Sequence, residues 1–141
     1  MQRKILTTLL AGFISLTSAC HKENDQEEQM SITNPKLKDY DFLKEMKEDS
    51  YFPNFLVEKG VIILKELCIQ IESTSPNTDE EIYKLTHSAT EKFNGLQEEF
   101  EDNESEIETA AREAIAEDFD VIVKAYGFDL DIEEVIAPRD W

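Results

Sequence analysis

The sequence predicts an all-α fold, a compact bundle of four main helices followed by a short C-terminal helix. Glycine and proline are scarce, with four of each among 141 residues, so the chain lacks the frequent turns of a many-stranded protein. Apolar residues recur three and four positions apart in several long stretches, which is the period of a helix with one buried face. Three of the predicted helices also begin with recognisable capping sequences.

The first two helices are predicted over residues 35–49 and 54–72. Asn34 and Pro35 are typical of the N-cap and the first position of a helix. An apolar residue follows at every third position of this first segment: Leu37, Tyr40, Leu43 and Met46. The segment at 54–72 is apolar around most of the cylinder, which is typical of a helix at the centre of a bundle.

Capping boxes predict where the remaining helices begin. The three pairs are Thr78 with Glu81, Ser105 with Glu108, and Asp131 with Glu134. The third helix then carries an apolar stripe over residues 82–100, and the fourth runs over residues 105–126. Gly127 suits the left-handed residue that ends such a helix, and a short final helix is expected over residues 132–137.

Residues 1–19 are predicted to be a lipoprotein signal peptide. Two basic residues precede an apolar segment at 5–16, which is too short to span a bilayer as a helix. Small residues then lead into Cys20, an order that resembles the bacterial lipobox, in which the cysteine is acylated and becomes the first residue. Leu16 lies four places before the cysteine, whereas lipoboxes favour three. The alternatives are ordinary signal-peptidase cleavage and a retained apolar helix.

Residues 20–34 are expected to form an acylated cysteine followed by a disordered acidic tether, and residues 35–141 the helical domain. The tether is charged and has no apolar period with which to fold. Acyl chains on Cys20 would hold the protein at a membrane. The acidic run after the cysteine resembles tethers of bacterial lipoproteins exported to the cell surface. We therefore expect a place in the bacterial cell envelope, at the outer membrane or cell surface.

The charge of the chain limits its partners. Its 14 basic and 32 acidic residues give a net charge of −18, which becomes −20 without the two basic residues of the signal. Nucleic-acid phosphates and anionic lipids would both be repelled, so no nucleic-acid partner is expected and membrane attachment must come from the acyl chains. A basic protein partner is compatible with this surface, and so is simple solubility.

No catalytic, cofactor-binding or metal-binding residue is predicted. Cys68 has no disulfide partner if Cys20 is acylated, and its apolar surroundings indicate a buried core residue. His87 is expected to be a half-buried polar residue. Lys84 occupies the position three residues before it, where a di-iron helix motif needs glutamate.

The densest chemical feature is a run of acids between the third and fourth predicted helices, without a basic residue. Its members are Glu98, Glu99, Glu101, Asp102, Glu104, Glu106 and Glu108. The first three oppose the dipole at the C-terminal end of the third helix, so part of the run is locally unfavourable. We interpret these residues as a possible partner surface. A solvated turn and a weak cation site are the alternatives, although the glycine-containing spacing of an EF-hand is missing.

From about Lys38 onward the chain contains residues 40–60 (YDFLKEMKEDSYFPNFLVEKG), residues 83–100 (YKLTHSATEKFNGLQEEF), the SEIETAAREAIAEDF segment, and the final KAYGFDLDIEEVIAPRDW. These segments give the chain a resemblance to a bacterial family, domain of unknown function 5713. It implies a small, mostly helical, self-contained domain without an assigned activity. It also implies that residues 1–34 are an addition, because members of this family are mostly short and lack an export signal.

These observations predict a lipid-anchored acidic helical domain of unknown function that acts as a protein-binding module. One alternative is an immunity or inhibitor protein that blocks a basic partner. The other is a small hydrolytic or metal-dependent enzyme, which would need His87 or a bound metal.

Overall fold

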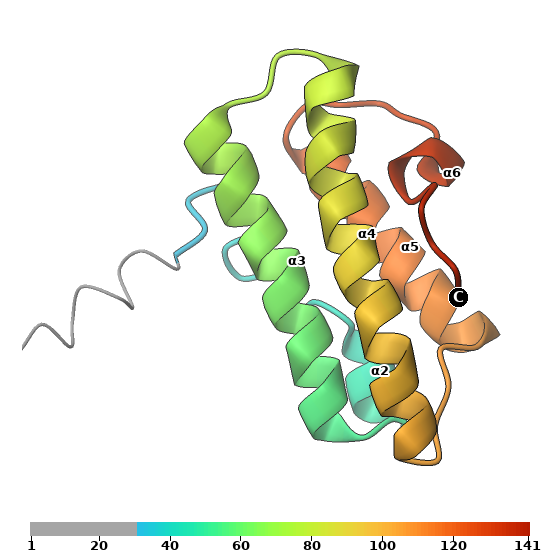
Figure 1. Ribbon diagram of the computed structural model, residues 1–141. Helices are drawn as coiled ribbons and strands as arrows, with labels where there is room; N and C mark the ends of the chain where they lie inside the picture. The colour runs from blue at the N-terminus through green and yellow to red at the C-terminus, as the bar shows by residue number, and fades with distance from the viewer. Residues whose placement is uncertain (1–30) are drawn as a thin grey trace, which may run out of the picture.

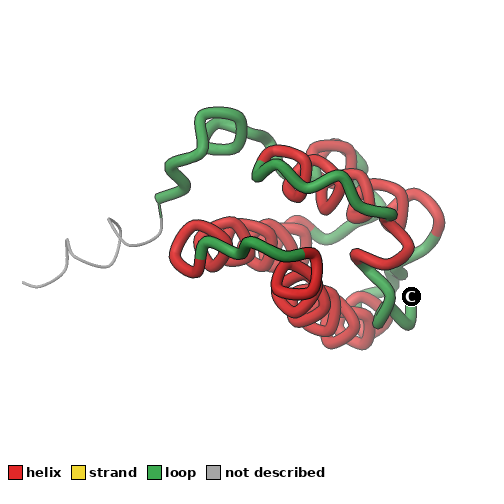
Figure 2. Tube along the Cα trace, turned by 90° about the horizontal axis from the view of Figure 1, so that it is seen from above, coloured by secondary structure: helices red, strands yellow, loops and turns green. Residues whose placement is uncertain are grey.

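The computed structural model describes residues 31–141, and no strand forms among them. Its helices are α2 (Lys44–Glu48), α3 (Asn54–Thr74), α4 (Asp79–Asp102), α5 (Thr109–Ala125) and α6 (Ile132–Val135). The two longest helices, α3 and α4, run antiparallel and side by side (Figure 1). The view from above shows α5 and the N-terminal loop in a second layer, against one face of this pair (Figure 2). The prediction of an all-α fold is confirmed.

The core lies between the two layers and receives large apolar side chains from every helix and from the N-terminal loop. The largest fully buried side chains are Phe42, Phe93, Phe100, Phe119, Leu37, Leu43, Leu56, Leu64, Leu67, Ile82, Ile115 and Ile122. Two buried threonines of α4 direct their hydroxyls back to the helix, since Thr90 Oγ1 donates to the carbonyl of Thr86 at 2.8 Å. Because such hydroxyls are hydrogen-bonded, their burial costs little free energy.

Gly60 allows the N-terminal segment to approach α3 closely. A Cβ atom at this position would lie 2.8 Å from Leu43 Cδ1 and 3.1 Å from the ring of Phe93. Both neighbours are buried, so the space beside the glycine backbone is already filled. The absence of a side chain at Gly60 is what lets residues from α4 and from the N-terminal segment meet on α3.

The prediction of a helix over residues 35–49 is wrong for most of its length. Only α2 is helical there, and residues 35–39 form a turn whose amides, those of Leu37 and Lys38, donate to the carbonyl of Asn34. Leu43 has a left-handed backbone with φ 52°, which interrupts a continuous helix before α2. Its N–H donates to the buried carboxylate of Asp118 at 2.7 Å, and this distant contact outweighs the local helical pattern.

The fourth helix also begins later than predicted. α5 starts at Thr109 with Glu108 as its N-cap, and no side chain caps it. The amide of Ser105 instead donates to the carbonyl of Phe100 at 3.0 Å, so this residue closes the end of α4. The predicted pairing of Ser105 with Glu108 as a capping box is therefore incorrect.

The other predicted helix boundaries agree closely with the structure. Thr78 caps α4, its hydroxyl accepting from the amide of Glu81 at 3.2 Å. Asp131 caps α6 as predicted, but through the amide of Glu133 and not that of Glu134, and α6 ends two residues earlier than predicted. Gly127 has a φ of 90°, as the left-handed residue after α5.

No helix within residues 31–141 combines the length and apolar character needed to cross a membrane.

Candidate functional site

The seven acids singled out from the sequence lie together at one end of the molecule, which we call the acidic end. It comprises Glu98, Glu99, Glu101, Asp102, Glu104, Glu106 and Glu108, from the last turn of α4 to the residue before α5. Six of the seven are exposed and Glu99 is half-buried. This segment forms the turn at the lower end of Figure 1.

Apolar anchors on either side of the turn hold the acidic end in place. Phe100 and Ile107 are buried, and so is Ser105 between them. The amide of Glu104 donates to Glu101 at 3.1 Å, and Glu104 has a left-handed backbone with φ 57°. Because Phe100, Ser105 and Ile107 are buried, the acids between and beside them are left at the surface.

Most of these carboxylates have no cationic partner in the described part of the chain. Lys59 of α3 binds Glu99 at 2.8 Å, and the phenol of Tyr51 donates to Glu108 at 3.2 Å. No described residue forms an ion pair with the other five: Glu98, Glu101, Asp102, Glu104 and Glu106. Two of them, Glu101 and Asp102, lie in the last turn of α4 and Glu98 directly precedes it, at the end of the helix where the dipole disfavours negative charge.

Tyr51 belongs to the same surface, and the sequence did not single it out. Its side chain is 43% exposed, and its ring lies edge-on to Phe52 with centroids 5.0 Å apart. Phe52 in turn contacts Phe100 of α4 edge-on at 6.4 Å. An exposed aromatic ring therefore adjoins the acidic end. The only sequence signal for it was an aromatic residue outside any helical stripe, shortly before Pro53.

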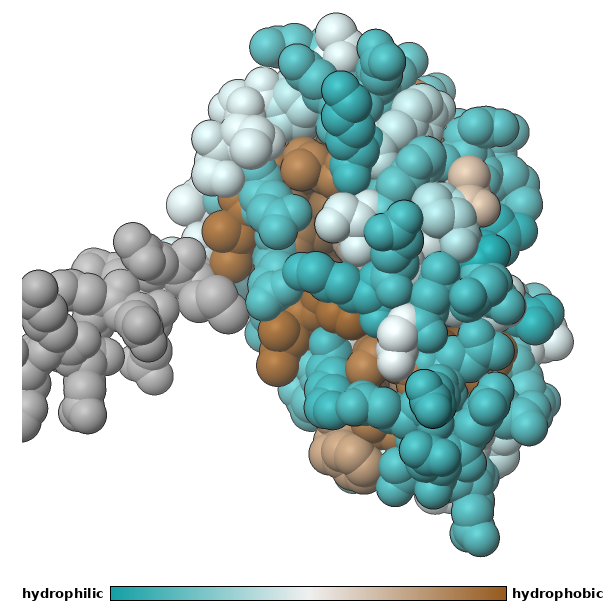
Figure 3. Space-filling model, viewed as in Figure 1, coloured by the Kyte–Doolittle hydropathy of each residue, from teal (hydrophilic) through white to brown (hydrophobic). Residues whose placement is uncertain are grey.

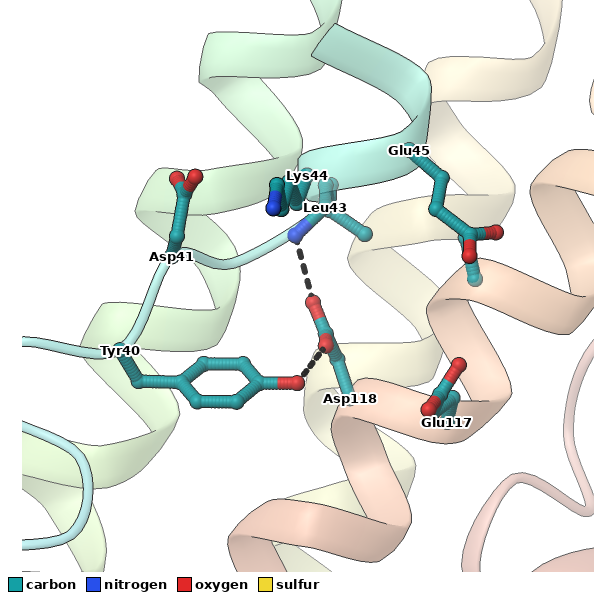
Figure 4. Close-up of a pocket in the computed structure, with 8 residues that line it drawn as sticks. Tyr40, Asp41, Leu43, Lys44, Glu45, Glu117 and Asp118 are labelled. Atoms are coloured by element: carbon teal, nitrogen blue, oxygen red, sulfur yellow. Dashed lines mark hydrogen bonds between the residues drawn. The ribbon is translucent and has the colours of Figure 1, made fainter. Parts of the chain in front are cut away.

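A second cluster of polar groups surrounds Asp118 of α5, and Figure 4 shows it at a cavity of about 230 Å³. The Asp118 side chain is only 5% exposed, and both of its oxygens accept hydrogen bonds. Tyr40 donates its phenol at 2.9 Å and Leu43 its amide at 2.7 Å. Burial raises the pKa of Asp118 to about 6, although these two hydrogen bonds favour the charged form. Since both oxygens are used within the fold, Asp118 holds the N-terminal segment against α5.

Glu72, near the C-terminal end of α3, fixes the start of the described chain. Its carboxylate accepts from the amide and hydroxyl of Thr33, from the amide of Asn34 and from the phenol of Tyr126, at 2.7–3.1 Å. Burial opposes ionisation here, but these hydrogen bonds lower the pKa of Glu72. Thr33 and Asn34 thus belong to the folded domain, although the sequence placed them in the tether.

His87 and Cys68 both have structural surroundings. The ring N–H of His87, at Nε2, donates to the carbonyl of Glu134 at 2.7 Å, and the ring stacks on Tyr83, so this half-buried residue joins α4 to α6. Cys68 is buried, and burial raises the pKa of its thiol to about 12. A thiol with such a pKa is a poor nucleophile at neutral pH. No described group of three or more His, Cys, Asp and Glu side chains is placed to hold a metal ion.

Residues 36–141 match the model of a family of unknown function, DUF5713. The chain belongs to this family. The match includes the acidic end, Tyr51 and the Asp118 cluster, so all of them are parts of the DUF5713 domain. No curated protein and no solved structure matches the chain. Cys20, the predicted lipidation site, precedes the family match and lies outside the described residues.

Proposed function

We propose that this DUF5713 domain is a protein-binding module that recognises a basic partner through the acidic end and is held at a bacterial cell envelope by acyl chains on Cys20. The observation that carries the proposal is the set of five carboxylates at one end of the molecule that have no cationic partner among residues 31–141. A folded domain gains no stability from placing Glu98, Glu101 and Asp102 at the C-terminal end of α4. Lysines or arginines of a partner would remove this unfavourable charge.

Electrostatics favour a basic partner over other classes. The chain has a net charge of −18, so its field attracts cationic surfaces and speeds their encounter. Charge alone gives little affinity, because exposed ion pairs contribute only about 0–1 kcal/mol each. An apolar contact is therefore needed beside the charges. Tyr51 supplies an exposed aromatic ring of the kind that dominates many protein interfaces.

The proposed anchor leaves the acidic end accessible. Thr33 and Asn34 are bound to Glu72 near the C-terminal end of α3, whereas Glu99 is bound to Lys59 near its N-terminal end. The helix has 21 residues, which corresponds to a length of about 31 Å. The chain that would lead to Cys20 and the acidic end thus lie at opposite ends of α3. A tether at Cys20 would not cover the recognition surface.

Capture of partners from the native cells tests the acidic end. The full chain would be compared with a variant carrying Glu98→Gln, Glu101→Gln and Asp102→Asn. A control with Glu91→Gln, Glu113→Gln and Asp129→Asn removes the same charge from exposed positions elsewhere. We expect the acidic-end variant alone to lose basic partners that the full chain retains after crosslinking. Equal capture by all three proteins would contradict the proposal, as would capture that does not weaken with added salt.

Tyr51 and Cys20 need separate tests. Tyr51→Ala should reduce capture of the same partners and leave the fold intact, because this side chain is partly exposed.

Labelling with a palmitate analogue should tag the wild type and the Cys68→Ala control but not Cys20→Ala. Equal labelling of the wild type and Cys20→Ala would contradict lipid anchoring. An inhibitor that covers a basic active site would use the same acidic end, and its target would be identified in the capture experiment.

A further inference from the structure

The outer face of α3 carries a row of apolar side chains that the fold does not cover. Phe55 is 55% exposed, Ile62 is 47% exposed and Ile69 is half-buried. They are seven residues apart, so they lie along the same side of the helix, opposite its buried residues. Figure 3 shows brown, apolar surface along α3 within a largely teal molecule. A row of this kind costs free energy in water unless another surface covers it.

Charged residues flank the row on both sides, and the two sides differ. Towards α4, Lys59 binds Glu99 and Glu66 binds Lys92, each at 2.8 Å. On the other side, Glu58 and Lys65 are exposed, and their side chains form no hydrogen bond or ion pair with any described residue. The face therefore offers one free negative charge and one free positive charge beside an apolar row.

We propose that the outer face of α3 binds the same face of a second copy of the chain, with the two helices antiparallel and a two-fold axis passing near Ile62. The row is symmetric about this residue, because Phe55 precedes it by seven positions and Ile69 follows it by seven. The two-fold axis then places Phe55 of each chain against Ile69 of the partner chain. Ile62 meets its own copy at the axis.

Charge complementarity identifies a second copy as the occupant. Glu58 lies four residues before Ile62 and Lys65 three residues after it, so antiparallel pairing brings Glu58 of each chain beside Lys65 of the other. A parallel pair would instead place Glu58 beside Lys59 of the other chain and Lys65 beside Glu66, but Lys59 and Glu66 are already paired with Glu99 and Lys92 of α4. Antiparallel pairing therefore forms two ion pairs between Glu58 and Lys65 across the interface, related by the two-fold axis.

Local neutrality also favours self-association at this face. The chain carries a net charge of −18, so most surfaces of two copies repel each other. Glu58, Lys59, Lys65 and Glu66, which flank the apolar row, have a combined charge of zero. The outer face of α3 is thus a place where two copies can approach without that penalty.

The size of the face sets the strength of the dimer. A single helix face buries less than the roughly 1,200 Å² of a standard interface, so the dimer is weak and reversible in solution. A shared membrane would strengthen it by concentrating the chains. If Cys20 anchors the protein, as proposed above, a two-fold axis along the membrane normal lets both chains reach the same bilayer.

Sedimentation of the purified full chain tests the dimer directly. The wild type should shift from monomer to dimer as its concentration rises, and Ile62→Glu should remain a monomer with unchanged helical circular dichroism. Glu58→Lys and Lys65→Glu should each weaken the dimer about tenfold, because each change makes both symmetric pairs repulsive. An equimolar mixture of these two variants should associate again, since each then offers the charges that the other lacks. Glu91→Lys, on the exposed face of α4, is the matched control.

Crosslinking of the full chain in its native cells gives a second readout. Ile62→Cys places a thiol at the two-fold axis, so mild oxidation should yield a covalent dimer, whereas the wild type and Glu91→Cys should not. A wild type that stays monomeric, or a dimer that Ile62→Glu does not weaken, would overturn the proposal. Binding of neutral lipid vesicles through Ile62 without dimer formation would also overturn it and assign the face to the membrane.

Discussion

Tyr40 and Asp118 are 78 residues apart in the sequence and are joined by a hydrogen bond of 2.9 Å from the phenol to the buried carboxylate. The second oxygen of the same carboxylate accepts the amide of Leu43 at 2.7 Å. A single side chain of α5 thus fixes two points of the N-terminal segment. Burial raises the pKa of Asp118 to about 6, so the folded protein retains a proton that the unfolded chain releases at lower pH.

This relationship predicts that Asp118 makes stability depend on pH. The pKa in the folded state lies above the ordinary value of 3.8, so the contribution of Asp118 is most favourable at low pH and declines as pH rises from about 4 to about 6. A rise of about two pKa units corresponds to about 2–3 kcal/mol in the free energy of unfolding. Asp118→Asn should remove this decline. The measurement is urea unfolding of both proteins across that pH range.

Two further variants check the origin of the effect. Glu113→Gln removes an exposed carboxylate from α5 and should leave the pH dependence of the wild type unchanged. Glu72→Gln should change it in the opposite sense, since the pKa of Glu72 is lowered and its contribution is lost as pH falls. If Asp118→Asn keeps the slope of the wild type, the carboxylate does not hold its proton in the folded state.

Gly60 and Gly95 should respond in opposite directions to alanine. Both lie within long helices, where alanine is intrinsically favoured by about 0.8–1 kcal/mol. A Cβ at Gly95 meets nothing within 4 Å, so Gly95→Ala should stabilise the protein by about that amount. A Cβ at Gly60 meets Leu43 at 2.8 Å and Phe93 at 3.1 Å, and overpacking of this kind costs about 1–3 kcal/mol.

Thermal unfolding of the two glycine variants is the measurement. We expect Gly60→Ala to lower the free energy of unfolding, because the overpacking outweighs the helical preference. A Gly60→Ala protein as stable as Gly95→Ala would mean that Leu43 moves aside freely.

The helices could be predicted where their signals are local. Thr78, Gly127 and Asp131 act within a few residues of themselves, and the structure shows each in its predicted role. The segment at 35–43 could not be predicted in this way. Its helical pattern is local, but Asp118, 75 residues further along, binds the amide of Leu43 and holds it in a left-handed turn.

The candidate site also has some residues with a local sequence signal and others that are positioned only by distant contacts. The acids of the acidic end are consecutive enough in sequence to be recognised as a group, and the structure places them at one end. Tyr51 joins them through the packing of Phe52 against Phe100 and through its hydrogen bond to Glu108, and both contacts are between distant segments. The attachment of Thr33 to Glu72 also spans 39 residues, which is why the sequence extended the tether too far.

Leu64 lies in the core, and its replacement by alanine measures how much its burial stabilises the fold. The side chain has no exposed surface, and Leu64→Ala should lower the free energy of unfolding by about 2–5 kcal/mol. Ile62 is on the same helix but 47% exposed, so Ile62→Ala should cost less than about 1 kcal/mol in the monomer. Chemical unfolding at a concentration that favours the monomer compares the two. Similar losses for both would contradict the assigned faces of α3.

Neighbouring acids of the acidic end should differ in their effect on stability. Glu98 has Glu101 three residues and Asp102 four residues further along α4, and both like-charge pairs lie at the C-terminal end of the helix, where the dipole disfavours them. Glu98→Gln removes the two like-charge pairs and the adverse interaction with the dipole. It should therefore raise the free energy of unfolding by about 0.5–1 kcal/mol at low salt. Glu99→Gln loses the ion pair with Lys59 at 2.8 Å, so its gain from the dipole is cancelled or reversed. Thermal unfolding of both variants should therefore rank Glu98→Gln above the wild type and Glu99→Gln at or below it, with the difference shrinking as salt screens the charges. Equal stabilisation by the two changes would show that the ion pair between Glu99 and Lys59 contributes nothing to stability. Both acids would then act on stability through charge repulsion alone.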